Sequence, residues 1–439
     1  MMKSTGLTVA AAGDILITKR IPEGNEGADS IRRFMLPADA RLANLETTVT
    51  DGRCYASAYS GGTWLTTDPA CLEDLKLYGF DYLGLANNHM MDYSYEGLRQ
   101  TLENVRRAGF ACGGAGESLG EASRPEFLET GNGRVAVISI CSTLEPAAAA
   151  GNSTHRMPGR PGINPLRFSR TYHLTKEHTA LLKELAERTG INVLHEHHRA
   201  QGFFAPLPEG VSEFGPVRFD LAAEEKDEGS SSAADPRDVE RTAAAIREAR
   251  ITSEVVIVML HSHEILGDRE DTPDSFAEDF ARTCIDAGAD AVIGSGTHQL
   301  KGIELYRGRP IFYGLGNFIF ENEYVRDLPA DYMEKYGLDP ETTAAEGIRA
   351  RTERAARSLY SMKEVYQTVV PRFVMKNGKC LKIELLPVSL GFGKKGYLKN
   401  LPAPATDAMT EEILRYVNRA SARYNLRFTR KGSCLEADI

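Results

Sequence analysis

Apolar runs that end in polar side chains recur along this sequence. The runs Leu7–Gly13, Tyr82–Ala86, Arg134–Ile140 and Val255–Leu260 each have the length and hydrophobicity of a buried strand. Between these runs lie segments in which apolar residues recur at helical spacing. Strands that alternate with helices in this way predict a layered α/β core.

The helical segments have recognisable apolar sides and ends. Helices are expected at Pro69–Tyr78, Gly97–Ala108, Asp238–Ala249 and Ser275–Ala287. In the first, Leu72, Leu75 and Leu77 are expected on the apolar side, and in the second Gly109 provides a C-terminal stop. Further strands are expected at Ala40–Leu45, Ala291–Gly294 and Pro310–Tyr313.

The alternation is interrupted once and changes character near residue 325. Residues 142–235 are expected to form a loop-rich insertion or lid, because Ala222–Asp235 (AAEEKDEGSSSAAD) is polar and of low complexity. Residues 1–325 are then the catalytic core. The segment 326–439 is expected to pack on that core as a charged helical stretch to about residue 365, strands at Tyr366–Met375 and Lys379–Val388, and a helix at Thr410–Ala422.

Composition narrows the possible partners. The net charge of −9 argues against nucleic acid as the main partner, while anionic substrates stay compatible because a bound cation reverses the local potential. Seven scattered cysteines without CxxC spacing suit free thiols in a reducing cytosol. No apolar stretch is long enough for a secretory signal or a membrane span, so a cytoplasmic protein is expected. Nothing in the sequence indicates an oligomeric state.

Metal-binding residue types follow five of the predicted strands. They are Asp14, Glu46, Asn88 with His89, His261 and His298. Oxygen donors suit Mg²⁺ or Mn²⁺, and imidazole adds affinity for Mn²⁺, Fe²⁺ or Zn²⁺. A carboxylate such as Glu46 is able to bridge two ions about 3.5–4 Å apart, which activate water and hold a phosphoryl group. The pattern therefore indicates a site for one or two divalent ions.

Each of these residues also has a structural explanation when taken alone. Asp14 suits a turn, Glu46 a solvated strand end, and the two histidines hydrogen-bonded positions in the core. Asn87 and Asn88 suit a tight turn that leads to Asp92 as a helix N-cap. The agreement of five separate strand ends favours the metal site.

Eight motifs in order carry a family resemblance. They are AAGD (Ala11–Asp14), NLE (Asn44–Glu46), LANNHMMDYSYEGL (Leu85–Leu98), GAG (Gly114–Gly116), RPGINPLR (Arg160–Arg167), an HxxE-like strand end (His261–Glu264), GSGTHQLKGIE (Gly294–Glu304) and PIFYGLGNFIF (Pro310–Phe320). Together they resemble the bacterial capsule-synthesis, poly-γ-glutamate CapA family, which is similar to the calcineurin-like metallophosphoesterases. The resemblance covers roughly residues 7–320, and its most specific parts are Asn-Asn-His followed by Asp and the GNF strand end.

The resemblance implies a fold and a ligand set. The expected core is a four-layer α/β/β/α metallophosphatase-like sandwich with an inserted lid region. One metal is expected to be held by Asp14, Glu46 and His298, and the other by Glu46, Asn88 and His261.

The resemblance also implies roles around the metals. His89 is expected to protonate a leaving group or to stabilise negative charge, and Asn317 to orient substrate or a metal-bound water. The substrate-binding residues are expected to be Asn87, Asp92, Arg160 and Ser295.

The chain departs from the metallophosphatase pattern at two places. Where those enzymes have Asp-x-His, this chain has Asp14-Ile15-Leu16, and where Gly-His-x-x-His is common it has Gly294-Ser295-Gly296-Thr297-His298. The first change removes one imidazole ligand. His263, two residues after His261, is an additional candidate ligand that compensates if the extended backbone persists.

The leading functional hypothesis is a CapA-like, metal-dependent hydrolase. It would cleave a phosphoester or an amide or γ-glutamyl-type bond in an anionic small molecule or peptide, and the resemblance links it to poly-γ-glutamate or cell-envelope metabolism. The first alternative keeps the metals but abstracts a Cα proton, giving peptide epimerisation. The second is a non-catalytic assembly factor for capsule polymer synthesis.

Overall fold

The computed structural model describes residues 6–354 and 358–439. Residues 1–5 of the predicted core and 355–357 of the predicted charged helical stretch lie outside the described residues. The chain divides into two compact units, one formed by Met1–Leu166 with Pro236–Ile439 and the other by Arg167–Asp235. The larger unit is mixed α/β with several sheets, which confirms the predicted fold class at this level.

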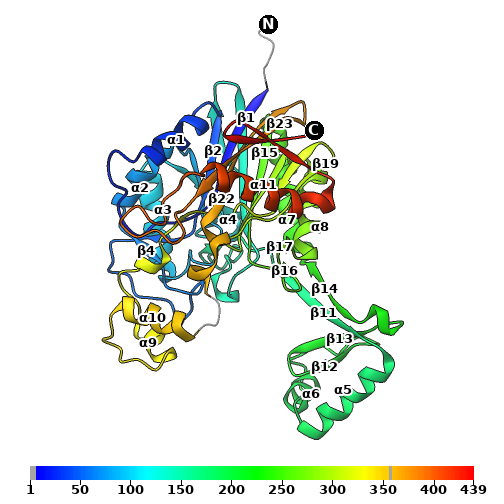
Figure 1. The fold of residues 1–439 in the computed structure, drawn as a ribbon. Helices are drawn as coiled ribbons and strands as arrows, with labels where there is room; N and C mark the ends of the chain where they lie inside the picture. The colour runs from blue at the N-terminus through cyan, green and yellow to red at the C-terminus, as the bar shows by residue number, and fades with distance from the viewer. Residues whose placement is uncertain (1–5, 355–357) are drawn as a thin grey trace. The chain divides into compact units, whose positions relative to one another are not determined.

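Strand β1 (Leu7–Leu16) lies inside the larger sheet of the larger unit. It pairs in parallel with β2 (Ala40–Leu45) and β21 (Asn317–Phe320), and antiparallel with β22 (Gln367–Lys376). Among the described residues this sheet has ten strands, of which the others are β5 (Tyr82–Gly84), β6 (Ala111–Gly113), β23 (Lys379–Ser389), β24 (Ala403–Pro404), β25 (Phe428–Lys431) and β26 (Cys434–Ala437). Figure 1 labels β1, β2, β22 and β23 of this sheet.

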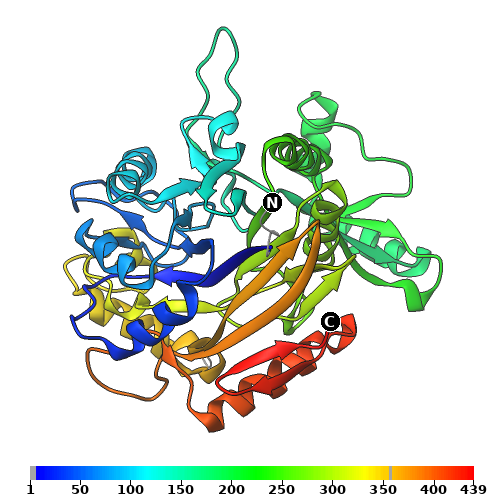
Figure 2. The same ribbon diagram turned by 90° about the horizontal axis from the view of Figure 1, so that it is seen from above.

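The C-terminal segment contributes directly to this sheet. Figure 2 shows β22 and β23, in orange, running beside the dark blue β1. Helix α11 (Asp407–Ser421) then adds Ile413 and Val417 to the apolar core beneath. The strands after residue 366 thus extend the central sheet, because β22 pairs antiparallel with β1 and β23 pairs with β22.

The second sheet of the larger unit is parallel at its centre. Its order is β19 (Ile303–Tyr306), β20 (Arg309–Phe312), β18 (Ala291–Gly296), β15 (Val255–Ser262), β9 (Gly133–Cys141) and β8 (Glu126–Thr130). Strands β9, β15, β18 and β20 are parallel, and β8 and β19 close the two edges antiparallel. The predicted strand at Val255–Leu260 is confirmed, and it continues to Ser262.

The two sheets face one another across an apolar core. Alternate residues of β1 point to opposite faces: Val9 packs in the core shared with the second sheet, and Ala10 packs on the other side. That other side is covered by α1 (Glu26–Met35), α2 (Ala70–Leu75) and α3 (Ser94–Arg107), which Figure 1 shows gathered together. Helices α7 (Pro236–Thr252) and α8 (Ser275–Ala287) contact β9, β15 and β18 of the second sheet.

Register brings the polar strand ends to one region. In the larger sheet, Asp14 lies opposite Asn44, which lies opposite Gly84 in the next strand. In the second sheet, His261 lies opposite Ser295. Because the carboxyl ends of parallel strands meet at the same edge, residues far apart in sequence converge there.

Three local predictions differ from the structure. Asp14 lies inside β1 rather than after it, because the strand continues to Leu16 beside β2 and β21. Leu77 is 36% exposed, since α2 tightens into a 3₁₀ turn at Lys76–Tyr78 that rotates this side chain away from the apolar side. Asp92 is not a helix N-cap, because α3 begins at Ser94.

The smaller unit has its own secondary structure. It holds a sheet in the order β12 (Ser212–Phe214), β13 (Val217–Leu221), β11 (Phe168–Leu174) and β14 (Gly229–Ala234), with α5 (Lys176–Thr189) and α6 (Val193–Ala200). The prediction of a loop-rich insertion is therefore wrong for this part. The low-complexity stretch pairs antiparallel with β11, so its backbone bonds are satisfied despite its polar side chains. The lid role stays a prediction.

Two further features bear on the chemistry. The seven cysteines are free, and six of them are buried. Within residues 6–354 and 358–439, no helix has both the length and the apolar run needed to cross a bilayer.

Candidate metal centre

Glu46 is a fully buried carboxylate without a hydrogen-bond donor. It directly follows β2, its side chain is 0% exposed, and neither carboxylate oxygen has a hydrogen-bond partner among the described residues. Imidazole nitrogens surround it: His261 Nε2 and His263 Nε2 lie 3.6 and 3.8 Å from Oε1, and His298 Nδ1 lies 3.9 Å from Oε2. Such spacings match donor atoms around an ion with metal–ligand bonds of about 2 Å.

Three donor atoms converge at one side of Glu46. His261 Nε2 lies 2.8 Å from Asn88 Oδ1 and 3.0 Å from His263 Nε2. Two imidazole nitrogens and an amide oxygen that face one another this closely are a donor set for a cation of mixed nitrogen and oxygen preference. His263, the additional candidate, follows directly after β15, and its Nε2 lies close enough to that of His261 to supply the imidazole that is missing after Asp14.

Asp14 supports the same cluster from β1. Its Oδ1 accepts a hydrogen bond from Asn44 Nδ2 at 2.7 Å, and its Oδ2 accepts one from the Gly296 amide at 2.9 Å. His261 Nδ1 lies 3.5 Å from Asp14 Oδ1 and 3.0 Å from the hydroxyl of Ser295. These contacts on Nδ1 leave Nε2 of His261 directed toward Glu46 and Asn88.

His298 is held in a strained backbone conformation. Its φ is +59°, which is rare for a residue with a side chain and costs on the order of 1–3 kcal/mol. Its Nδ1 lies 2.8 Å from Asn317 Oδ1, while Asn317 Nδ2 donates to the carbonyl of Val365 at 3.1 Å. The surrounding structure therefore fixes the ring against its backbone preference, as is common at functional sites.

Two groups of possible ligand atoms share Glu46. Suitable ligand atoms of Asp14, Glu46 and His261 lie within 4.8 Å of one another, as do those of Glu46, His263 and His298. His261 Nε2 also lies 2.8 Å from Asn88 Oδ1 and 3.6 Å from Glu46 Oε1, so Glu46, Asn88 and His261 are close together as well. How these residues divide between two ions stays a prediction.

His89 and Asp92 form a buried pair beside the cluster. His89 Nδ1 lies 2.6 Å from Asp92 Oδ2, and the Asp92 carboxylate also accepts hydrogen bonds from the amides of Gly61 and Leu65. A Cβ on Gly61 would lie 2.6 Å from Asn88 Nδ2 and 2.8 Å from the His89 ring, so only glycine fits there. The pair holds the proton of His89 on Nδ1 and leaves Nε2 for a reacting group.

Burial governs the electrostatics of the cluster. Burial, together with the charges of Asp14 and Asp92, raises the pKa of Glu46 well above its usual range. Burial alone would raise the pKa of Asp14, but the contact with His261 lowers it. Burial and the neighbouring imidazoles lower the pKa of His263 well below its usual value, which favours the neutral imidazole. Among the described residues, the buried carboxylates of Asp14, Glu46 and Asp92 form ion pairs only with histidines, which favours a bound cation.

A cleft of about 300 Å³ opens beside these groups. It is lined on one side by His89, His263 and His298. A wider polar cavity adjoins it, since Glu270 and Gln299 line both. The cleft brings a ligand of modest size to the imidazole side of the cluster.

The predicted substrate-binding residues differ in where they lie. Asn87 and Asp92 are 0% exposed and are hydrogen-bonded within the protein. The Ser295 hydroxyl lies 3.0 Å from His261 Nδ1, and Asn317 Oδ1 lies 2.8 Å from His298 Nδ1. Arg160 is exposed and donates to the carbonyl of Ala149. The roles of these residues toward a substrate stay predictions.

Sequence reasoning missed two contributors. Asn44 donates to Asp14 and lies 3.2 Å from His261 Nδ1, and its position in the NLE motif was a usable signal. Arg351, from α10 (Ala344–Arg354), lines the cleft. It lies in a charged stretch that carries no motif.

Comparisons with known proteins show which family the sequence matches. A sequence model described as bacterial capsule synthesis protein PGA_cap matches residues 8–322, a range that contains all the proposed ligands. The protein y4sH of Sinorhizobium fredii is 30% identical over 435 residues, which cover 97% of this chain and 91% of that protein.

More distant relatives have descriptive names. The PGA biosynthesis protein CapA of Bacillus subtilis is 25% identical over 327 residues, covering 73% of this chain and 65% of its own length. A probable polyglutamine synthesis accessory protein of Mycobacterium tuberculosis is 25% identical over 292 residues, covering 65% of this chain and 56% of its own length.

Proposed function

Since this chain belongs to the bacterial capsule synthesis protein PGA_cap family, we propose that it is a metal-dependent hydrolase whose centre is Glu46. The observation that carries the proposal is the pair of buried, unpartnered oxygens of Glu46 among three imidazoles. An ionised carboxylate in this position is costly unless a cation neutralises it. The proposed fold is the four-layer α/β/β/α arrangement, with α1–α3, the two sheets and α7–α8 as successive layers.

The donor set fits one or two divalent ions. The residues that would hold them are Asp14, Glu46, Asn88, His261, His263 and His298. The mixture of carboxylate, amide and imidazole suits Mn²⁺, Fe²⁺ or Zn²⁺ better than Mg²⁺, which prefers oxygen ligands alone. When bound, such an ion polarises a phosphoryl or carbonyl oxygen and lowers the pKa of water.

The protein side chains would supply positioning and proton transfer. Asp92 holds the proton of His89 at Nδ1, so Nε2 is the atom that exchanges a proton with the leaving group in the cleft. Ser295 and Asn317 fix the rings of His261 and His298. Outer partners of this kind usually change metal affinity or activity by about 10–100-fold when they are removed.

The substrate class proposed is an anionic phosphoester, or an amide or γ-glutamyl-type compound. The second class follows from relatives named for PGA biosynthesis and polyglutamine synthesis. The word "accessory" in the mycobacterial name supports the alternative of an assembly factor that binds metal without turnover. The predicted cytoplasmic location stays a prediction.

The test measures metal content and hydrolysis together. Wild type, Asp14→Asn and His261→Ala would be purified with Mn²⁺ and with Zn²⁺, and their bound metal measured by mass spectrometry. Each would then be assayed with p-nitrophenyl phosphate, bis-p-nitrophenyl phosphate and γ-glutamyl-p-nitroanilide. We expect metal-dependent release of the chromophore by the wild type alone. Metal without turnover of any substrate would favour the assembly factor, and equal metal content in all three proteins would refute the site.

A further inference from the structure

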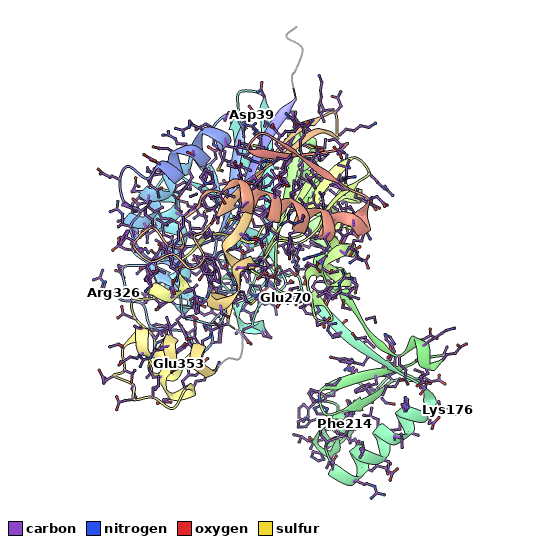
Figure 3. The ribbon with its side chains drawn as sticks, in the orientation of Figure 1. Asp39, Lys176, Phe214, Glu270, Arg326 and Glu353 are labelled. Atoms are coloured by element: carbon purple, nitrogen blue, oxygen red, sulfur yellow. The ribbon has the colours of Figure 1, made fainter. Side chains whose placement is uncertain are left out.

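The cleft beside the metal centre contains a cation that the hydrolytic mechanism does not use. Arg351 lines the cleft together with the imidazoles of His89, His263 and His298. It is the only Lys or Arg among the described residues that line this cleft. Arg351 belongs to helix α10, on which Figure 3 labels the nearby residue Glu353.

The guanidinium of Arg351 has no acidic partner in the described residues. One of its terminal nitrogens donates a hydrogen bond to the hydroxyl of Thr63 at 2.5 Å. Arg349, on the same helix, has an ion pair with Glu353 at 3.5 Å and is 69% exposed. The cation that faces the cleft is thus left without a carboxylate, while its neighbour on the surface has one.

The other residues that line the cleft indicate which kind of ligand Arg351 binds. Ile265, Leu359 and Met362 supply apolar surface in the same cleft. A cleft with metal ligands, apolar side chains and one unpaired guanidinium suits a ligand with a reacting group, a short alkyl portion and a second negative charge. Arg binds planar oxyanions through two parallel hydrogen bonds, so a carboxylate or a phosphate is the matching group.

We infer that Arg351 is a specificity residue that binds a second anionic group of the substrate, a carboxylate or a phosphate, separate from the group that reacts at the metal centre. This inference rests on the proposed function for the reacting group. It goes beyond that function because it requires the substrate to carry at least two polar ends. It also assigns a role to α10, which lies beyond the matched residues 8–322.

The test compares the binding of two small acids that both carry a carboxylate on an unbranched alkyl chain. Glutarate carries two carboxylates and butyrate one, and each would be titrated calorimetrically into the full-length Mn²⁺-loaded protein. We expect wild type to bind glutarate about 10- to 100-fold more tightly than butyrate, since a hydrogen bond to a charged group is worth about that factor. In Arg351→Gln this preference should fall to about threefold or less, while butyrate affinity stays unchanged.

Matched variants separate recognition from support of the fold. Arg349→Gln removes a cation from the same helix and should keep the preference for glutarate. Thr63→Val removes the hydrogen bond to Arg351 but leaves its charge, so it should keep the preference as well. If Thr63→Val loses the preference as Arg351→Gln does, Arg351 only tethers α10 and the inference is wrong.

Other outcomes are equally decisive. Equal affinity of wild type for the two acids, no binding of either, or a preference that survives in Arg351→Gln would overturn the inference. A titration with 4-phosphonobutyrate shows whether phosphate-type or carboxylate groups lose more affinity in Arg351→Gln. Bound metal is measured in the same samples. A protein without metal that still prefers glutarate through Arg351 would refute the proposed hydrolase but not this binding role.

Discussion

Two buried glutamates follow strands on either side of β1, and their surroundings are opposite. Glu46 follows β2 and donates its amide to the carbonyl of Ile15, while Glu321 follows β21 and donates its amide to that of Leu16. Both side chains are 0% exposed. The local backbone and the burial are therefore closely similar.

The difference lies in the donors that reach each carboxylate. Glu321 accepts the amides of Thr18 and Lys19 at 2.9 and 3.1 Å, and Lys19 Nζ lies 3.2 Å from its other oxygen. Glu46 has no such donor and faces imidazoles instead. A buried carboxylate with its own donors belongs to the fold, whereas one without them requires a partner from outside the chain.

The largest predicted effect is on metal binding. Glu46→Gln should lower the affinity for Mn²⁺ by at least about 100-fold, because it removes the carboxylate shared by both ligand groups. Loss of a ligand should reduce the affinity more than the loss of a residue that only orients a ligand, which costs about 10–100-fold. Glu321→Gln should change this affinity by less than about threefold. Isothermal titration of metal-free protein measures both. Comparable losses in the two variants would show that Glu46 acts only through the fold.

When the free energy of unfolding is measured instead, Glu321→Gln should show the larger loss of the two variants. In the absence of metal at pH 7, Glu321→Gln should lower the free energy of unfolding by about 3 kcal/mol, since it leaves Lys19 without its buried partner. Glu46→Gln should be neutral or stabilising, because glutamine is uncharged without a proton, whereas Glu46 must either take up a proton on folding or be buried with its charge. Urea unfolding in EDTA gives both values, and a strong destabilisation by Glu46→Gln would contradict the assignment.

A smaller effect concerns pH. Burial raises the pKa of Glu46 well above the ordinary value of 4.5 for a glutamate. Between pH 4.5 and that raised value the folded, metal-free chain keeps a proton that the unfolded chain has lost. Stability therefore falls as pH rises through this window, by at most about 1.4 kcal/mol per pH unit.

The measurement is urea unfolding of metal-free protein from pH 5 to 8. The stability of wild type relative to Glu46→Gln should decline steadily as the pH rises, because the glutamine variant lacks this titration. Saturation with Mn²⁺ should remove the decline, since the ion favours the ionised carboxylate. Parallel stability profiles of the two metal-free proteins would show that Glu46 is not desolvated as described.

Sequence patterns predicted the buried strands and the residues at their ends, but not the donors around each residue. The predicted strands that correspond to β1, β9 and β15 are confirmed, because a continuous hydrophobic run indicates a buried strand directly. Nothing adjacent in the sequence distinguishes Glu46 from Glu321, because the difference comes from Lys19 on one side and His261 on the other.

A motif identifies residues but not the contacts that they make in the fold. Asn87 and Asn317 lie in the most specific motifs, and both side chains are buried within hydrogen-bond distance of their neighbours. Residues 142–235 are expected to be loop-rich because Ala222–Asp235 is polar, but long-range pairing of β11 with β14 overrides local propensity there. Arg351 was missed because a single Arg in a charged helix is normally a surface residue.

The smallest predicted effect tests the hydrogen bonds behind the ligands. Ser295→Ala removes the hydroxyl 3.0 Å from His261 Nδ1 and should lower Mn²⁺ affinity by about tenfold, because the ring is then less firmly oriented. The matched change beside the other glutamate is Thr18→Ala, which removes a hydroxyl that donates to the Glu321 carbonyl at 3.2 Å. That variant should leave Mn²⁺ affinity unchanged in the same titration. If Ser295→Ala binds metal as tightly as wild type, His261 is positioned by Asp14 and Asn44 alone.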